Sequence, residues 1–191
     1  MSRRKMASFP DSLHNKHTVD FTSAFPVEKF TAPDVVIFGC GNIYLGDDGF
    51  GPAVINALNK DNALPEKVEA IDAGTSIRDQ LFDFLLAETL RPKHIIIVDS
   101  IDREDRQPGE VFTIDPDAIP AQKIHDFSLH QFPTVNMLQE LQEFTKVKVS
   151  IVVAQISEPA EEVTEGLSLD IQQAVPTACN LIMDIVSATH K

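Results

Sequence analysis

The sequence predicts an α/β protein: a three-layer α/β/α sandwich with a mainly parallel sheet of about five strands. From Val35 onward, short β-branched runs alternate with segments of helical periodicity, which is typical of parallel strands joined by crossover helices. The length of 191 residues is near that of one ordinary domain and allows a substantial buried core. We therefore predict a single domain over residues 34–191. Residues 1–33 show neither the apolar period of a strand nor that of a helix, and we predict a loosely ordered extension there.

Five segments have the composition of strands. The run VVIFG at 35–39 predicts a buried strand, and HIIIVDS at 94–100 has almost no polar interruption, so this strand is expected at the centre of the sheet. The segment GEVFTID at 109–115 is expected at an edge. The remaining two predicted strands are KVEAID at 67–72 and KVSIVVAQI at 148–156.

Between these strands, apolar residues recur at the spacing of an α-helix. We predict helices over 48–60, 76–90 and 133–145. The tail is expected to form a turn capped by Ser168 and then a longer helix that begins at Pro176. Proline is tolerated in the first turn of a helix but not in its middle, which sets that predicted start.

Composition excludes several classes of function. The net charge of −13 would repel a polyphosphate backbone, which argues against nucleic acid as a partner. Such a surface suits a metal cation or a basic polypeptide, although an acidic balance is most often a matter of solubility. Cys40 and Cys179 match no zinc or disulfide spacing, which fits a reducing cytosol. No membrane span or secretory signal is found, so we expect a soluble cytoplasmic protein, monomeric in isolation.

The acidic residues follow the predicted strands. A glycine-bearing turn comes after the first strand and is followed by Asp47 and Asp48, while Asp72 and Asp99 come at the ends of the next two. The carboxyl edge of an open α/β sheet is where ligands bind. Carboxylates about 4 Å apart repel each other by about 1 to 4 kcal/mol per pair, so a proton or a cation is expected among them. His130 precedes a predicted helix and is a candidate nitrogen donor to the same site.

Each of these residues also has a purely structural interpretation. Asp47 or Asp48 could cap the following helix, because Asp is a preferred N-cap residue. Asp99 could hold a loop amide, and Asp72 could form a turn with the residues that follow it. Convergence of several carboxylates at one edge favours a functional role over these alternatives.

The histidines and the cysteine beside the site have structural alternatives as well. His125 and His130 lie in a polar segment where a solvated histidine is the usual outcome. Cys40 is more typical of a small buried residue than of a nucleophile, because no basic neighbour is apparent to lower its pKa.

A dinucleotide-binding loop is the other interpretation of the glycine turn. Gly39, Cys40 and Gly41 match the first half of G-x-G-x-x-G, but the sixth position is Tyr44. The acidic residue expected about 20 positions further on has no clean match, and the following carboxylates would face the pyrophosphate. The sequence therefore disfavours this interpretation.

Four motifs together resemble one known family. They are GCGNIYLGDDGFG at 39–51, DAGTS at 72–76, IIIVDSID at 95–102 and, after a Ser-Leu pair, HQF at 130–132. As a set they resemble the [NiFe]-hydrogenase maturation endopeptidases, and the first motif is most similar to the maturation proteases of coenzyme F420-reducing hydrogenases in methanogenic archaea. The resemblance covers roughly residues 34–187, in order.

The resemblance implies a cytoplasmic, aspartyl-type protease that removes the C-terminal peptide of a hydrogenase large subunit precursor after nickel insertion. By position, the nickel-binding residues of the family fall on Asp48, Asp99 and His130, and Asp72 matches a family aspartate considered for a catalytic role. Many relatives carry Glu where this chain has Asp48, so the shorter carboxylate would have to lie closer to the metal. The turn residues expected to bind substrate are Gly39, Gly41, Asn42, Gly74 and Thr75.

The ligand chemistry agrees with this implied site. Two carboxylates and one imidazole suit nickel or zinc, and other divalent cations can substitute. Such a set should hold a metal weakly, so the nickel is expected to be weakly bound or to arrive with the substrate. A metal-polarised or a carboxylate-activated water would then attack the scissile bond, and the sequence leaves both open. No nucleophile elbow is apparent, which disfavours a serine or cysteine protease.

A non-catalytic function is the alternative from a different class. The same three ligands could serve a nickel-binding assembly factor that recognises the loaded large subunit without cutting it. Cleavage of a nickel-loaded precursor by this protein alone would separate the two.

Overall fold

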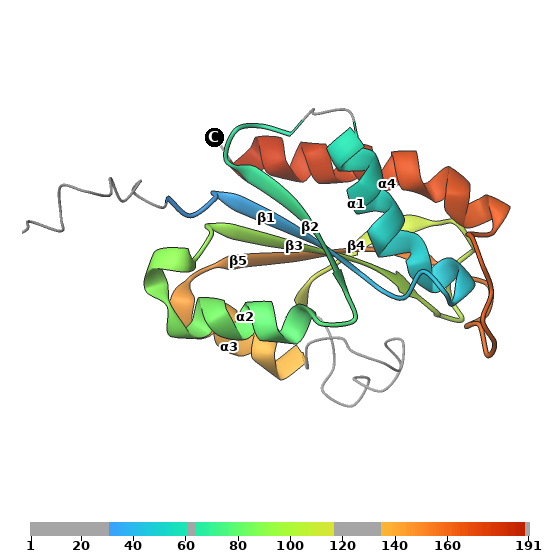
Figure 1. Cartoon of the computed structure of the whole chain (residues 1–191), viewed down its shortest axis with the longest axis horizontal. Helices are drawn as coiled ribbons and strands as arrows, with labels where there is room; N and C mark the ends of the chain where they lie inside the picture. The colour runs from blue at the N-terminus through green and yellow to red at the C-terminus, as the bar shows by residue number, and fades with distance from the viewer. Residues whose placement is uncertain (1–30, 61–63, 117–134, 190–191) are drawn as a thin grey trace, which may run out of the picture. The chain divides into compact units, whose positions relative to one another are not determined.

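The computed structural model describes residues 31–60, 64–116 and 135–189 (Figure 1). Within these residues, five strands form one sheet in the order β2-β1-β3-β5-β4. All pairs are parallel except the one between β4 and β5. The strands are β1 (Val35–Cys40), β2 (Val68–Gly74), β3 (His94–Ile101), β4 (Val111–Ile114) and β5 (Lys148–Gln155). The predicted mainly parallel sheet, with a central third strand and the fourth at an edge, is confirmed.

Helices cover both faces of this sheet. They are α1 (Phe50–Lys60), α2 (Ile77–Leu86), α3 (Val135–Thr145) and α4 (Leu169–Thr189). α1 and α4 pack on one face, and α2 and α3 pack on the other, so the predicted three-layer sandwich is confirmed (Figure 1). None of the described helices is long and apolar enough to cross a membrane. Residues 1–30 of the predicted extension lie outside the described residues, so the prediction for them stays a prediction.

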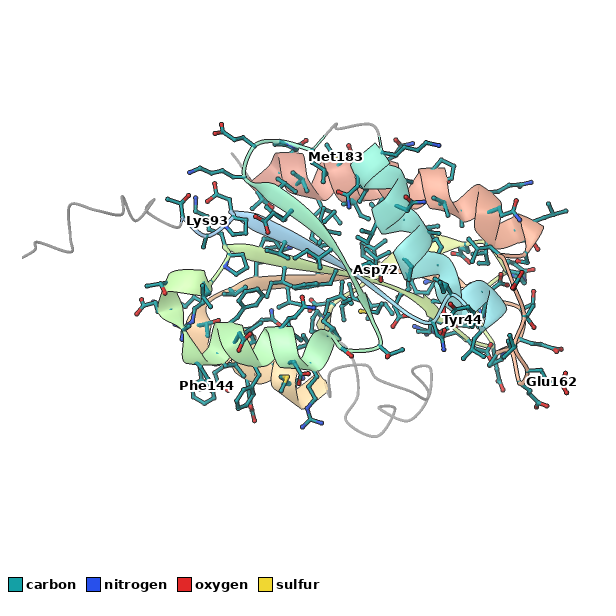
Figure 2. The ribbon with its side chains drawn as sticks, viewed as in Figure 1. Tyr44, Asp72, Lys93, Phe144, Glu162 and Met183 are labelled. Atoms are coloured by element: carbon teal, nitrogen blue, oxygen red, sulfur yellow. The ribbon has the colours of Figure 1, made fainter. Side chains whose placement is uncertain are left out.

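The two central strands are buried on both faces. Every position of β1 and β3 is buried, which explains why their sequences show no alternation between polar and apolar residues. Along β3, Ile95 and Ile97 belong to the core beneath α2 and α3, while Ile96 and Val98 belong to the core beneath α1 and α4. Each such buried side chain stabilises the fold by about 1.5–3 kcal/mol. Figure 2 shows the side chains between the layers, with Lys93 and Glu162 pointing outward.

The last helix differs from its prediction. α4 begins at Leu169 rather than at Pro176, which lies inside it. The predicted cap at Ser168 is present but serves α4 itself: its Oγ accepts a hydrogen bond from Ile171 N at 3.4 Å, and its carbonyl oxygen accepts one from Gln172 N at 2.8 Å. A proline in a helix costs about 3 kcal/mol. One buried stripe runs past it on both sides and outweighs that cost: Ile171, Ala174, Ala178, Ile182 and Val186.

Candidate active site at the carboxyl edge of the sheet

Close packing explains the glycines of the first motif. A Cβ on Gly51 would lie 2.2 Å from the carbonyl oxygen of Cys40, and one on Gly39 would lie 2.4 Å from Ile55 Cγ1. α1 therefore lies directly on the end of β1, closer than any larger residue would permit. Gly41 has a φ of +123°, and a Cβ there would lie 1.8 Å from the carbonyl oxygen of Asp48. The glycine turn thus brings an acidic loop against the end of the strand.

The two adjacent carboxylates of this loop have different partners. Asp48 Oδ2 accepts a hydrogen bond from Asn42 N at 2.7 Å, which closes the loop back onto the end of β1. Asp47 Oδ1 accepts one from Ser168 N at 2.6 Å, at the start of α4. Neither arrangement is the predicted alternative of a cap on the helix that directly follows. Asp47 holds two segments together, whereas Asp48 is part of the loop beside the sheet edge.

Asp99 lies deeper than its position in the sequence suggested. It was expected at the very end of a strand, but β3 continues to Ile101 because β5 pairs with it over its whole length. Asp99 is 6% exposed, and its Oδ1 accepts a hydrogen bond from Ser100 N at 2.8 Å. Burial raises the pKa of Asp99 to about 8; the Ser100 N–H opposes this rise and the carboxylate of Asp48 adds to it.

Asp72 stands at the end of the edge strand β2. Asp72 pairs with Gly39 and Gly74 pairs with Cys40, so Ala73 is an extra residue that bulges the strand. Asp72 Oδ1 accepts a hydrogen bond from Gly74 N at 2.9 Å, which confirms the turn-forming alternative for one of its oxygens. The side chain is exposed at the sheet edge, unlike the carboxyl group of Asp99.

Cys40 shows that the three carboxylates converge. Burial raises the pKa of its thiol well above the usual range, and Asp99, Asp72 and Asp48 raise it further, in that order. Because the charges of all three act on one sulfur atom, the three carboxylates lie near the end of β1. A nucleophilic cysteine needs its thiolate, so this environment keeps Cys40 inert and agrees with its structural interpretation.

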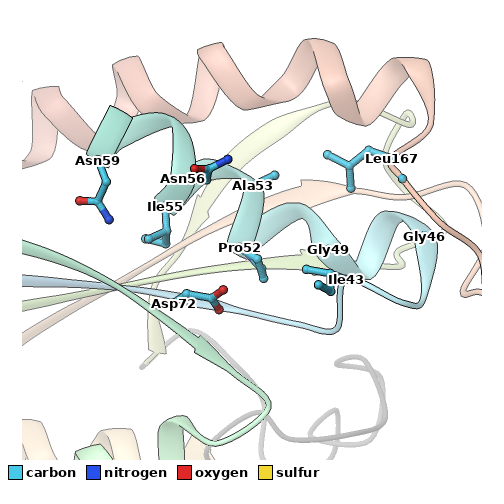
Figure 3. A pocket seen from close by; sticks show the side chains of 11 residues that line it. Ile43, Gly46, Gly49, Pro52, Ala53, Ile55, Asn56, Asn59, Asp72 and Leu167 are labelled. Atoms are coloured by element: carbon cyan, nitrogen blue, oxygen red, sulfur yellow. The ribbon is translucent and has the colours of Figure 1, made fainter. Parts of the chain in front are cut away.

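A cavity of about 560 Å³ opens beside Asp72 (Figure 3). In Figure 3 Asp72 faces α1, and Leu167 lies at the far part of the cavity. The lining residues come from the glycine loop, α1, the end of β2 and the segment before α4: Ile43, Gly46, Gly49, Pro52, Ala53, Ile55, Asn56, Asn59, Asp72, Gly166 and Leu167. The polar α1 residues of this lining are Asn56 and Asn59. They are three positions apart, and no motif in the sequence marked them.

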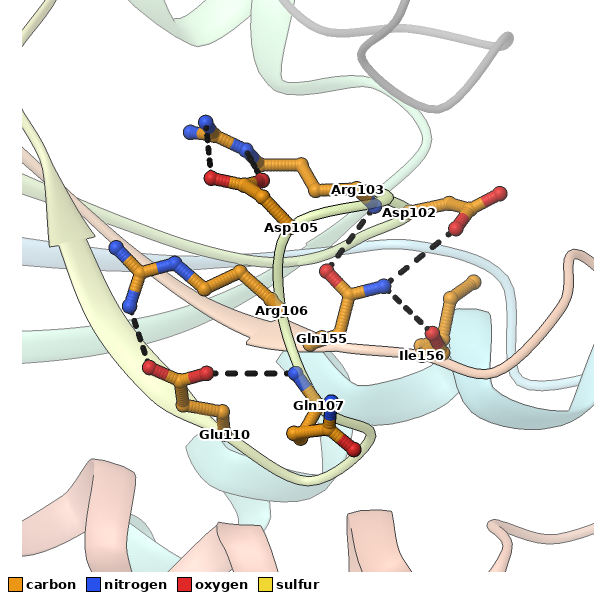
Figure 4. Close-up of polar contacts among 8 residues, drawn as sticks. All are labelled: Asp102, Arg103, Asp105, Arg106, Gln107, Glu110, Gln155 and Ile156. Atoms are coloured by element: carbon orange, nitrogen blue, oxygen red, sulfur yellow. Dashed lines mark hydrogen bonds and ion pairs between the residues drawn. The ribbon is translucent and has the colours of Figure 1, made fainter.

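A polar cluster holds the chain that follows β3 (Figure 4). The buried Gln155 accepts a hydrogen bond from Arg103 N at 3.0 Å and donates to the carbonyl oxygen of Ile156 at 2.7 Å and to Asp102 Oδ1 at 3.4 Å. Nearby, Arg106 pairs with Glu110. These contacts hold the chain in place after the end of β3 at Ile101, two residues beyond Asp99.

The predicted metal ligands are brought together in part. Asp48 and Asp99 converge, together with Asp72. His130, like His125, lies outside the described residues, so its role as a ligand stays a prediction. Among the described residues, no group of three His, Cys, Asp or Glu side chains is arranged to hold a metal ion.

The predicted substrate-binding residues occupy different depths. Gly39 is buried under α1, and Thr75 is exposed. Gly41 N donates a hydrogen bond to the carbonyl oxygen of Gly74 at 2.9 Å, which joins the two turns, and Asn42 lies beside them. A packing role accounts for Gly39, and contact of these residues with substrate stays a prediction.

The fold and the site together define an α/β protein whose acidic residues lie near the point where the strand order reverses, between β1 and β3. Residues 52–185 match the model of the HycI family, described as hydrogenase maturation protease. The chain belongs to this family of peptidases, which confirms the resemblance seen in the motifs.

Relatives over most of the chain agree. It is 33% identical over 160 residues to coenzyme F420 hydrogenase subunit delta of Methanothermobacter thermautotrophicus, a match that covers 82% of this chain and 96% of that protein. It is 38% identical over 151 residues to a protein of Methanocaldococcus jannaschii whose own assignment as a hydrogenase maturation protease is provisional, with 78% and 94% covered. The solved hydrogenase maturating endopeptidase HybD from E. coli superposes with a TM-score of 0.64 at 27% identity, over 81% of this chain and 93% of that one.

Proposed function

We propose that the protein removes the C-terminal peptide from the large subunit precursor of a [NiFe]-hydrogenase once nickel has been inserted. The observation that carries this proposal is the position of Asp48, Asp72 and Asp99 near the end of β1, where the charges of all three act on Cys40, in a chain of the hydrogenase maturation protease family. The F420-reducing type is the proposed substrate, because the relative from Methanothermobacter is named as a subunit of that hydrogenase.

Nickel carried by the substrate is the proposed recognition signal. Buried or close carboxylates are stabilised by a cation, and oxygen and imidazole ligands suit nickel. Asp48 and Asp99 would contribute the carboxylates and His130 the imidazole. Three protein ligands leave room for the cysteines that already hold the ion in the precursor.

Asp72 is the proposed catalytic residue of an aspartyl-type endopeptidase. It is exposed and borders the cavity, and only its Oδ1 is engaged by the Gly74 amide. Its Oδ2 is therefore placed to accept a proton from a water molecule that attacks the scissile carbonyl carbon. Docking of nickel on Asp48 and Asp99 would hold the bond within reach of that water.

The protein is proposed to act in the cytoplasm, where large subunits would be assembled. Both cysteines are free thiols, as a reducing compartment requires. The monomeric state in isolation stays a prediction.

The test is cleavage of purified precursor, with and without nickel, by purified protein treated with chelator and dialysed. Gel mobility should show shortening of the nickel-loaded precursor only, and Asp72→Asn should abolish it while Asp79→Asn, on α2, leaves it unchanged. Equal cleavage of both precursors would argue against nickel recognition. The relative named as a hydrogenase subunit also supports the non-catalytic assembly factor, and binding of the loaded precursor without any cleavage would favour that function.

A further inference from the structure

We infer that the cavity along α1 binds the peptide that is released, the residues that follow the scissile bond, and that Asn56 holds its backbone. This inference rests on the proposed function. It assigns the two halves of the substrate to opposite sides of Asp72.

The positions of the carboxylates indicate which half of the substrate enters the cavity. Asp99 lies between Ile97 and Ile101 on β3, and both neighbours belong to the core on the α2 and α3 face. The cavity lies on the other face, against α1, and neither Asp48 nor Asp99 lines it. If the half of the substrate that keeps the nickel docks at these carboxylates, the half beyond the scissile bond is left to enter the cavity.

The lining has the chemistry of a peptide site. Aliphatic side chains and polar groups share its walls about equally, and Ile43 is 55% exposed although it is apolar. Among the lining residues Asp72 is the only charged one, so an acidic segment would meet repulsion and no compensating base. The cavity therefore suits a segment with aliphatic, neutral or basic side chains.

Asn56 is a polar residue of the lining whose side chain has no partner among the described residues. Asn59 Nδ2 already donates a hydrogen bond to the carbonyl oxygen of Ala70 at 3.0 Å. Asn56 is exposed and lies three residues before Asn59 on α1. Its side chain makes no hydrogen bond within the described residues. A carboxamide both donates and accepts, which matches the N–H and C=O of one peptide unit.

The far wall of the cavity is preformed. Gly46 N donates to the carbonyl oxygen of Thr164 at 2.7 Å, and Thr164 N donates to that of Tyr44 at 2.9 Å. These two bonds join the loop that carries Ile43 to the segment that leads to Leu167. A wall that is already ordered lowers the entropy lost when a flexible peptide binds.

The experiment uses a fluorescent synthetic peptide with the sequence of the released C-terminal extension, and its anisotropy with the full-length protein. Asn56→Trp should fill the cavity and weaken binding about tenfold or more. Lys60→Trp is the matched control, because Lys60 is exposed on the same helix one turn further on and does not line the cavity; its affinity should stay within about twofold of wild type. Asn56→Ala removes only the carboxamide and should weaken binding by about two- to tenfold. Thermal melts check that each variant is folded.

Two results would overturn the inference while the proposed function stands. One is cleavage of the nickel-loaded precursor by the wild type together with equal peptide affinity of the Asn56→Trp and Lys60→Trp variants. The other is binding, sensitive to Asn56→Trp, of a peptide from the side that precedes the scissile bond and not of the released one. Absence of any cleavage by the wild type would instead count against the proposed function, because peptide affinity is measured without it.

Discussion

Asp47 and Ser168 are 121 positions apart in the chain and are joined by a hydrogen bond of 2.6 Å from the backbone N–H of Ser168 to Asp47 Oδ1. The next residue, Asp48, makes a bond of the same kind with Asn42 N at 2.7 Å. Two neighbouring carboxylates therefore each hold a backbone amide, and only one of them also belongs to the acidic cluster around Cys40.

This pair allows stability and activity to be separated. Asp47→Ala and Asp48→Ala should each lower the free energy of unfolding by about 1 kcal/mol, because each removes one partly solvated hydrogen bond to a carboxylate. Processing of nickel-loaded precursor should be lost only in Asp48→Ala. Urea unfolding and gel mobility measure the two effects, and equal loss of processing in both variants would contradict the division of roles.

Substitutions at the proposed ligands should remove function and leave the fold. In Asp99→Asn an amide of similar shape takes the place of a buried carboxyl group, so the midpoint of thermal unfolding should stay within a few degrees of wild type. His130→Ala should also remain folded, because the sequence predicts His130 in a polar segment before a helix, and binding residues in such segments contribute little to the core. Both variants should fail to process the nickel-loaded precursor. Full cleavage by either variant would show that the substituted residue is not needed for nickel recognition.

Gly41→Ala should be far more destabilising than an alanine at Gly166, which also has a positive φ. Gly41 has a φ of +123° and its new Cβ would collide with the carbonyl oxygen of Asp48, whereas Gly166 has a φ of +82° and no atom within 4 Å of its Cβ position. We expect Gly166→Ala to cost about 1 kcal/mol from backbone strain alone, and Gly41→Ala about 2–4 kcal/mol. Urea unfolding measures the loss in the free energy of unfolding for each variant. Similar losses would show that the glycine loop rearranges around the new Cβ at little cost.

His94 should make stability depend on pH. Its ring is fully buried, with Nδ1 2.8 Å from Thr189 Oγ1 and Nε2 2.9 Å from Ser150 Oγ. Burial, and then the charge of Lys148, lower the pKa of His94 from 6.5 to about 4. Since the unfolded chain binds the proton first, the stabilisation is present above the unfolded pKa and is lost as pH falls from there through the folded value.

His94 should contribute a loss of about 2 kcal/mol in the free energy of unfolding between about pH 7 and pH 5. The raised pKa of Asp99 acts in the opposite direction over this interval and is common to both proteins compared below, so the difference between them isolates His94. His94→Gln has no titrating ring, so its stability should fall less over the same interval. Urea unfolding of both proteins at the two pH values gives the difference. An identical pH dependence of wild type and variant would show that His94 does not titrate as its burial implies.

The sequence by itself determined the features that depend on near neighbours along the chain. The apolar runs within 35–39 and 94–100 predicted two buried strands, the second of them central, because a strand buried on both faces needs few polar positions. The order of strands and helices predicted the layers, and the ends of successive strands predicted the edge at which Asp48, Asp72 and Asp99 meet.

Only the tertiary structure decided what depends on segments far apart in the chain. Pro176 lies inside α4 because the packing of that helix on the sheet outweighs a local preference. Asp47 and Asp48 are adjacent residues of one type, and their contacts differ because Ser168 comes to lie beside one of them. The burial of Asp99 depends on β5 pairing beyond it, and the cavity along α1 on four separate segments. Such contacts form only when the chain packs, since burial and hydrogen bonding act across space whatever the separation along the sequence.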